Sequence, residues 1–198
     1  MKKHLVLALL CAAAPAQVAV EGIANRFTAG LSLVSTQGDY RSFTNQPMGF
    51  GAEATFDITR SAEVINVRAM LGVVRVNGKD REDIGTKLNL NGIRAGLDFT
   101  FQTPSPKLTP YAGIILTKWS GHADSQGSLS EAQATFKDNE PKFGFRVGLE
   151  YAFTNHLVLA ADYNHSEWRH SKDITTTVVK GINPVNPSWM SMTLRYRF

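Results

Sequence analysis

The last ten residues of the chain constrain its fold more than any other stretch, because apolar and polar side chains alternate there without a break. The apolar set is Met190, Met192, Leu194, Tyr196 and Phe198, and the polar set is Ser191, Thr193, Arg195 and Arg197. Strict alternation predicts a β-strand between two different environments. An apolar terminal edge invites aggregation in a soluble protein. A closed membrane barrel avoids this problem, because its last strand pairs with its first and its apolar face meets lipid.

The N-terminal residues predict a cleaved signal peptide over residues 1–16. A basic start, Met1–His4, precedes the apolar run Leu5–Ala14, and Ala14-Pro15-Ala16 matches a cleavage site. The apolar run is too short to cross a bilayer as a helix. Residues 17–198 are then expected to form one barrel domain. Loss of Cys11, the single cysteine, excludes a disulfide framework and a thiol nucleophile in this mature chain.

The overall charge balance gives no indication of a nucleic-acid partner. Charged residues make up 19% of the 198 residues, and the formal net charge of +4 falls to +2 when Lys2 and Lys3 are removed. The chain contains no basic helix or lysine and arginine run. We therefore expect no nucleic acid among its partners.

Alternation continues through the mature chain and predicts an all-β fold, an eight-stranded antiparallel up-and-down transmembrane β-barrel. The expected strands cover residues 26–35, 48–58, 65–73, 86–101, 108–120, 143–153, 157–164 and 189–198. Connections after the first, third, fifth and seventh strands are long and polar, and those after the second, fourth and sixth are short. This asymmetry is typical of outer-membrane barrels, in which short turns face the periplasm.

Three local expectations follow from the same pattern. Before Asn91-Gly92 the apolar residues stand at even positions and after it they stand at odd positions. This change of strand face predicts a β-bulge. The faces of the fifth strand cannot be assigned, because Ala112 and Ile114 and also Tyr111 and Ile115 are apolar. Residues 121–141 are expected to form a long polar loop.

Aromatic residues collect near both ends of the predicted strands, as interfacial girdles require. Those expected near the short turns are Phe27, Phe56, Phe99, Phe101, Tyr151, Phe153, Tyr196 and Phe198. Those expected near the long loops are Phe50, Tyr163, Phe143, Trp168, Trp119 and Trp189.

The opposite strand face carries five acids and five arginines. They are Glu53, Asp57, Asp98, Glu150 and Asp162, with Arg68, Arg94, Arg146, Arg195 and Arg197. A narrow barrel interior requires such a balance, because buried charges must be paired. We therefore expect a packed internal network that acts as a structural plug. Two alternatives stay open, a conducting pore lined by these residues and a soluble lipocalin-like barrel with its faces reversed.

The mature chain resembles small outer-membrane barrels of the OmpA, OmpX and opacity-protein type. The resemblance rests on the strand–turn–strand unit Gly144–Tyr163 and on the terminal strand ending in Phe198. It implies that the protein lies in an outer membrane of the Gram-negative kind and contacts its lipid and lipopolysaccharide. It also implies a structural or surface-interaction role, such as adhesion or resistance, in which external loops contact a host or surface ligand. It also implies that Leu194, Tyr196 and Phe198 form a signal for the barrel assembly machinery. An OmpW-like pore for apolar solutes is the main alternative.

Residues suited to catalysis occur at the outer end of the seventh predicted strand, but their spacing does not favour an enzyme. Asn164-His165-Ser166-Glu167 and His170-Ser171 supply the residue types of a lipid A hydrolase. His165 and Ser166 are adjacent, so their side chains would point to opposite faces. The charged run Lys79–Asp83 suits a divalent ion or a lipopolysaccharide phosphate, or simply a solvated loop tip. We expect no catalytic residue, no resident metal and no cofactor.

Overall fold

The computed structural model describes residues 26–37, 45–59, 64–79, 86–127, 130–137, 140–167 and 187–198. The strands in it are β1 Phe27–Gln37, β2 Asn45–Asp57, β3 Ile65–Lys79, β4 Thr86–Phe101, β5 Leu108–Gly127, β6 Ser130–Lys137, β7 Lys142–Ala152, β8 Leu157–Ser166 and β9 Ser188–Arg197. The predicted signal peptide lies outside these residues, as do Trp168, His170, Ser171 and residues 80–83.

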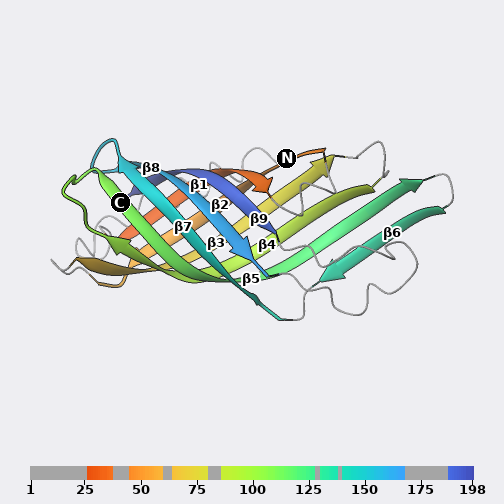
Figure 1. The fold of residues 1–198 in the computed structure, drawn as a ribbon, viewed down its shortest axis with the longest axis horizontal. Coiled ribbons are helices and arrows are strands. Elements are labelled where there is room, and N and C mark those ends of the chain that lie inside the picture. The colour runs from red at the N-terminus through yellow and green to blue at the C-terminus, as the bar shows by residue number, and fades with distance from the viewer. Residues whose placement is uncertain are drawn as a thin grey trace.

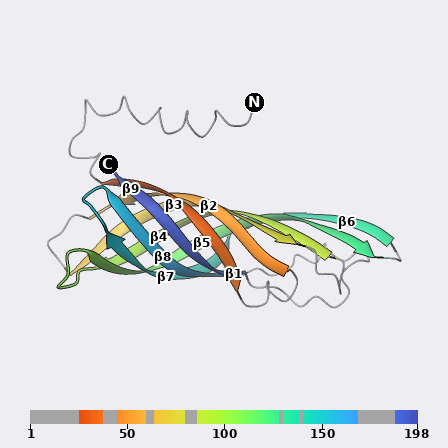
Figure 2. The ribbon, with the colours of Figure 1, turned by 90° about the horizontal axis from the view of Figure 1, so that it is seen from above.

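Eight of these strands form a closed antiparallel barrel (Figures 1 and 2), which confirms the predicted fold class. The order around the wall is β1, β2, β3, β4, β5, β7, β8 and β9, and β9 pairs back with β1. In this closing ladder Thr28 lies opposite Arg197 and Leu31 lies opposite Leu194. The terminal strand therefore has a partner on each side, because β8 also pairs with it.

β6, the one described strand outside the closed ring of eight, corrects the prediction of a long loop over residues 121–141. β5 continues to Gly127 and turns back as β6, which pairs with β5 from Ser120↔Lys137 to Gly127↔Ser130. This hairpin extends well beyond the barrel wall (Figure 1). Polar residues occupy both parities of this segment, so it lacks the apolar alternation that indicated the other strands.

The predicted bulge at Asn91-Gly92 is wrong. β4 pairs in continuous register through this point with both neighbours, Val74↔Gly92 and Gly92↔Trp119. Leu90 is buried inside the barrel rather than turned outward. The parity switch arose because the interior becomes apolar at this level, so an apolar residue there does not mark the outer face.

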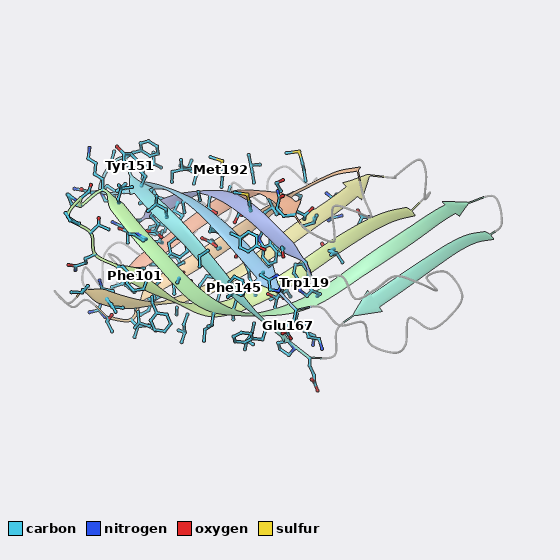
Figure 3. The ribbon with its side chains drawn as sticks, in the orientation of Figure 1. Phe101, Trp119, Phe145, Tyr151, Glu167 and Met192 are labelled. Carbon is cyan, nitrogen blue, oxygen red and sulfur yellow. The ribbon has the colours of Figure 1, made fainter. Side chains whose placement is uncertain are left out.

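The barrel wall presents its apolar side chains outward. Leu31, Leu33, Leu71 and Ile93 are each more than 60% exposed, and Figure 3 shows Tyr151 and Met192 projecting away from the wall. Between Tyr111 and Gly121 of β5 the even-numbered residues, including Ile114 and Leu116, face outward, and the odd-numbered residues face inward. Among the described residues, no helix is long and apolar enough to cross a membrane.

Most of the aromatic residues assigned to the outer face lie there, but two tryptophans do not. Phe50, Phe143, Phe153 and Tyr196 are about half exposed. Trp119 and Trp189, which were expected in the outer girdle, are 1% exposed and lie inside the barrel. Both have the inward parity of their strands, so their position follows from register rather than from residue type.

Candidate functional site

In the part of the chain that the structure describes, eight charged side chains are buried in the barrel interior, and they are called the charge network. They are Glu53, Arg68, Arg94, Asp98, Arg146, Glu150, Asp162 and Arg195, and each is buried. They come from six strands, β2, β3, β4, β7, β8 and β9. Four arginines and four carboxylates give this set no net formal charge, as burial away from water requires.

Glu53 is the carboxylate that joins most of these arginines. Its Oε2 accepts from Arg94 Nη2 at 3.0 Å and from Arg146 Nη1 at 3.3 Å. Its Oε1 accepts from Arg195 Nε at 2.7 Å. One carboxylate of β2 thus connects to β4, β7 and β9 across the barrel.

Arg68 connects a second group of carboxylates nearer the short-turn end. Its Nη1 donates to Glu150 Oε1 at 2.6 Å, and its Nη2 donates to Asp98 Oδ2 at 3.2 Å. Arg195 also donates to Glu150. Because Arg195 bonds to both Glu53 and Glu150, the two groups form one connected network.

Tyr111 of β5 lies at the centre of the network and was not identified from the sequence. Its hydroxyl donates to Asp162 Oδ2 at 2.9 Å and accepts from Arg146 Nη2 at 2.9 Å. The guanidinium carbons of Arg68, Arg146 and Arg195 lie 5.2, 5.0 and 5.5 Å from its ring centroid. These distances are within the range of favourable cation–π contact. Only the inward parity of Tyr111 could have indicated this role, and that parity was ambiguous.

Neutral polar groups also donate hydrogen bonds to Asp162. Its Oδ1 accepts from Ser191 Oγ at 2.7 Å and also from Asn164 Nδ2. The side-chain oxygen of Asn164 accepts from Arg94 Nη1 at 3.2 Å. Asn164 therefore links Arg94 to Asp162 within the network.

Glycines make room for these large side chains on the neighbouring strands. Gly148 lies opposite both Tyr111 and Asp162. A methyl group added there would lie 2.5 Å from Tyr111 Cζ and 2.7 Å from Asp162 Cβ. Any larger residue would displace the ring at the centre of the network.

A cluster of apolar side chains, called the apolar layer below, fills the interior toward the end with the long connections. It consists of Val34, Met70, Val74, Val76, Leu90, Ile115, Trp119 and Trp189. The two indole rings meet edge to face with centroids 5.6 Å apart. Trp119 Nε1 donates to Ser166 Oγ at 3.2 Å. The interior is thus polar in one part and apolar in the other, whereas the sequence predicted a polar interior.

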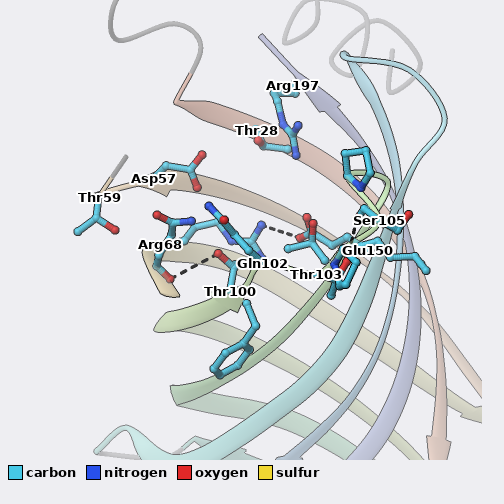
Figure 4. A pocket seen from close by; sticks show the side chains of 16 residues that line it. Thr28, Asp57, Thr59, Arg68, Thr100, Gln102, Thr103, Ser105, Glu150 and Arg197 are labelled. Atoms are coloured by element: carbon cyan, nitrogen blue, oxygen red, sulfur yellow. Dashed lines mark hydrogen bonds and ion pairs between the residues drawn. The ribbon is translucent and has the colours of Figure 1, made fainter. Parts of the chain in front are cut away.

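The other end of the interior opens as a pocket of about 580 Å³ (Figure 4). Asp57 and Arg197, the two remaining members of the predicted set of ten, line it and are partly exposed. Arg68 and Glu150 also line it, so the pocket reaches the charge network. The predicted ten residues therefore divide into eight buried residues and two at this mouth.

The residues considered for catalysis do not form a triad in the described part of the chain. Ser166 is buried inside the barrel, whereas His165 packs against the outward Phe145 ring with centroids 5.2 Å apart. His165 Nδ1 instead lies 2.8 Å from Ser188 Oγ on β9. Among the described residues, no group of His, Cys, Asp and Glu side chains could hold a metal ion.

The proposed assembly signal lies on the outer face of β9. Leu194 and Tyr196 are about half exposed, and Phe198 packs against Phe27 with ring centroids 5.6 Å apart. Tyr196 stacks on His156 at 5.7 Å. Recognition by an assembly machinery stays a prediction.

Comparison with known proteins identifies similar sequences and folds. A family model described as outer membrane protein beta-barrel domain matches residues 4–198. Neisserial surface protein A aligns with 87% of this chain and 96% of its own, at 20% identity and a TM-score of 0.56. The attachment invasion locus protein Ail of Yersinia pestis aligns with 87% of this chain and 97% of its own, at 12% identity and a TM-score of 0.54.

A major outer membrane protein from Thermus thermophilus has the same fold. It aligns with 87% of this chain and 98% of its own, at 14% identity and a TM-score of 0.53. Comparison with curated protein sequences gives no significant match. At these identities the structural matches show a common fold and nothing finer.

Proposed function

The chain belongs to the outer membrane protein beta-barrel family, and we propose that it is a closed barrel with a structural and surface-interaction role. The barrel would anchor the protein in the outer membrane, and the segments at the end with the long connections would contact ligands outside the cell. Lipid and lipopolysaccharide would surround the apolar wall. The short-turn end would then face the periplasm.

The filled interior is the observation that carries this proposal. The charge network connects opposite walls of the barrel, and Arg94, Asp98 and Arg146 are each at most 1% exposed. The apolar layer fills the next section. An eight-stranded barrel is only wide enough to be filled by its own side chains, so both sections favour a plug over a water-filled channel.

The β5–β6 hairpin supports a role at the surface. It continues the wall beyond the barrel, as Figures 1 and 2 show from two directions. Two proteins of the same fold are named as a surface protein and as an attachment invasion locus protein. A projecting hairpin gives a partner a surface that is separate from the bilayer.

Planar-bilayer recording of the refolded full chain tests the closed interior. We expect no steady conductance when insertion is verified separately by protease protection. Substitution Glu53→Gln should also leave the barrel closed, because the apolar layer remains. Reproducible open steps from the unmodified chain would contradict the plug and support the small pore, the main alternative.

A hairpin deletion tests the surface role separately. Replacing residues 122–136 by a short glycine–serine turn should leave the barrel foldable, because β5 pairs with β7 only from Leu108 to Thr117 and keeps its pairs with β4 from Tyr111 to Gly121. Cells displaying this variant should lose adhesion to host cells or abiotic surfaces. A matched control replaces Pro104–Pro106 in the opposite turn, and equal loss from both variants would contradict a specific role for the hairpin.

A further inference from the structure

The sheet that projects from the barrel ends in β6, which has a partner strand on one side only. Among the described strands β6 pairs with β5 alone, whereas every strand of the closed ring pairs on both sides. Its register with β5 runs without a break from Ser120↔Lys137 to Gly127↔Ser130. Figures 1 and 2 show this hairpin beyond the barrel wall. A continuous, unpaired strand edge is a template on which another strand can pair.

The ladders of β5 determine which backbone groups of β6 point to this free edge. β4 occupies one side of β5 in continuous register from Tyr111 to Ser125, so β7 and β6 lie in turn on the other side. At the start of that side, Ala152 N donates to Lys107 O at 2.8 Å. Because bonding residues alternate along an antiparallel ladder, odd-numbered residues of β5 direct their N–H and C=O groups to that side.

The same alternation continues into β6. Its even-numbered residues lie opposite odd-numbered residues of β5, as in Ala123↔Ala134, and bond to them. The odd-numbered residues of β6 therefore direct their N–H and C=O groups to the free edge. These residues are Glu131, Gln133, Thr135 and Lys137.

This edge is complementary to a second copy of itself in one antiparallel register, centred on Ala134. Glu131 then lies opposite Lys137 of the second copy, and Gln133 lies opposite Thr135. Both pairs join residues whose backbone groups point to the edge, so they can exchange hydrogen bonds. Opposite formal charges also face each other at both ends of the pairing, which is favourable. A shift of one residue mismatches the bonding groups, and a shift of two loses the charge pairs.

Membrane orientation decides where such an antiparallel pair can form. Copies in one membrane are related by rotation about the membrane normal, which leaves both β6 strands running the same way along the normal. Copies in two facing membranes are related by an axis in the membrane plane, which reverses one strand. Residues 118–127 of β5 lie beyond its last pair with β7 and span about 33 Å along the strand. This length exceeds the headgroup layer of about 5–8 Å.

We propose that β6 binds β6 of a second copy in a facing membrane by antiparallel strand addition centred on Ala134, and thereby joins the two membranes. This inference rests on the proposed function, because the hairpin must lie outside the cell, and it goes further by naming the partner and the contact. Backbone hydrogen bonds supply the affinity, and the facing charges of Glu131 and Lys137 select the register.

Vesicles that carry the refolded full chain test this contact. Two populations with different dyes are mixed, and joined particles are counted after added protease has shown that the hairpin is accessible. We expect the unmodified chain to join vesicles. Glu131→Lys or Lys137→Glu, each used in both populations, should lower the joined fraction about tenfold, because like charges then face each other at both ends. Glu140→Lys, the same change of charge at an exposed position outside β6, is the matched control and should have little effect.

Mixing the two charge variants with each other tests the partner and the register together. One population carries Glu131→Lys and the other carries Lys137→Glu, so each facing position again holds one acid and one base. We expect joining to return to the level of the unmodified chain, which also shows that both variants fold. The proposal is overturned if unmodified vesicles with accessible hairpins do not join, if either variant joins normally with itself, or if the mixture stays unjoined. Adhesion of cells to other surfaces measures the surface role separately, so these outcomes do not decide it.

Discussion

Glu53 and Arg195 are bonded to each other across Gly30, although 142 positions separate them in the sequence. Gly30 lies opposite Glu53 on one side and opposite Arg195 on the other. Glu53 Oε1 is 2.5 Å from Arg195 Nη2 over the glycine between them. This ion pair therefore links the strands on either side of β1, next to the ladder that closes the barrel.

Substitution Gly30→Ala should weaken this closure. An added methyl carbon would lie 2.7 Å from Arg195 Cγ and 2.9 Å from the Leu194 carbonyl oxygen. Overpacking of this kind lowers the free energy of unfolding by about 1–3 kcal/mol. Urea unfolding in lipid vesicles, followed by tryptophan fluorescence, measures the change. Ala161→Val, which adds carbon atoms on the exposed outer face, should change it little.

Substitution Glu53→Gln should destabilise the barrel more strongly. It removes the negative charge shared by Arg94, Arg146 and Arg195, which would stay buried. Loss of one partner from a buried ion pair costs about 3–5 kcal/mol. The same unfolding measurement applies, and Glu140→Gln at an exposed carboxylate is the control. An equal stability of both variants would show that Glu53 does not hold the network together.

Substitution Tyr111→Phe should destabilise the barrel while preserving its shape. It removes the hydroxyl group between Asp162 and Arg146 and leaves the ring on which three arginines lie. We expect a loss of about 1–3 kcal/mol in the free energy of unfolding, because buried partners lose a hydrogen bond. Tyr151→Phe on the outer face should cost much less. A loss no greater than that of this control would contradict a central role for the hydroxyl.

Substitution Leu31→Arg should reduce insertion into vesicles. Leu31 is 63% exposed on the apolar wall and lies opposite both Ala52 and Leu194. An arginine on the lipid face costs about 2–4 kcal/mol near the bilayer midplane. The folded fraction can be measured by electrophoresis without heating, with Leu31→Ala as the control. Unchanged insertion of the arginine variant would mean that this face does not meet lipid.

Alternation of side chains made the barrel predictable from the sequence. Each strand separates lipid from a filled interior, so residues such as Leu194 and Arg195 must alternate whatever their partners are. The bounds of β4, Thr86–Phe101, match the prediction for the same reason. The β5–β6 hairpin extends beyond the closed barrel, where neither face must be apolar, so its sequence carries no such signal.

Residue type was misleading where the two environments resemble each other. Trp119 and Trp189 were assigned to the lipid interface because tryptophan is common there. They lie in the apolar layer, as does Leu90. An apolar side chain suits both sides of the wall at this level, and only strand register decides between them.

The sequence by itself determined which residues alternate, how many strands close the barrel and which parity carries the charges, because these are local consequences of a strand between two environments. Only the tertiary structure decided that Glu53 meets Arg94, Arg146 and Arg195, and that Tyr111 lies among the arginines. Those contacts depend on the stagger of strands around a closed wall. That stagger is set by all the strand pairings together, so it cannot be deduced from the sequence of any single strand.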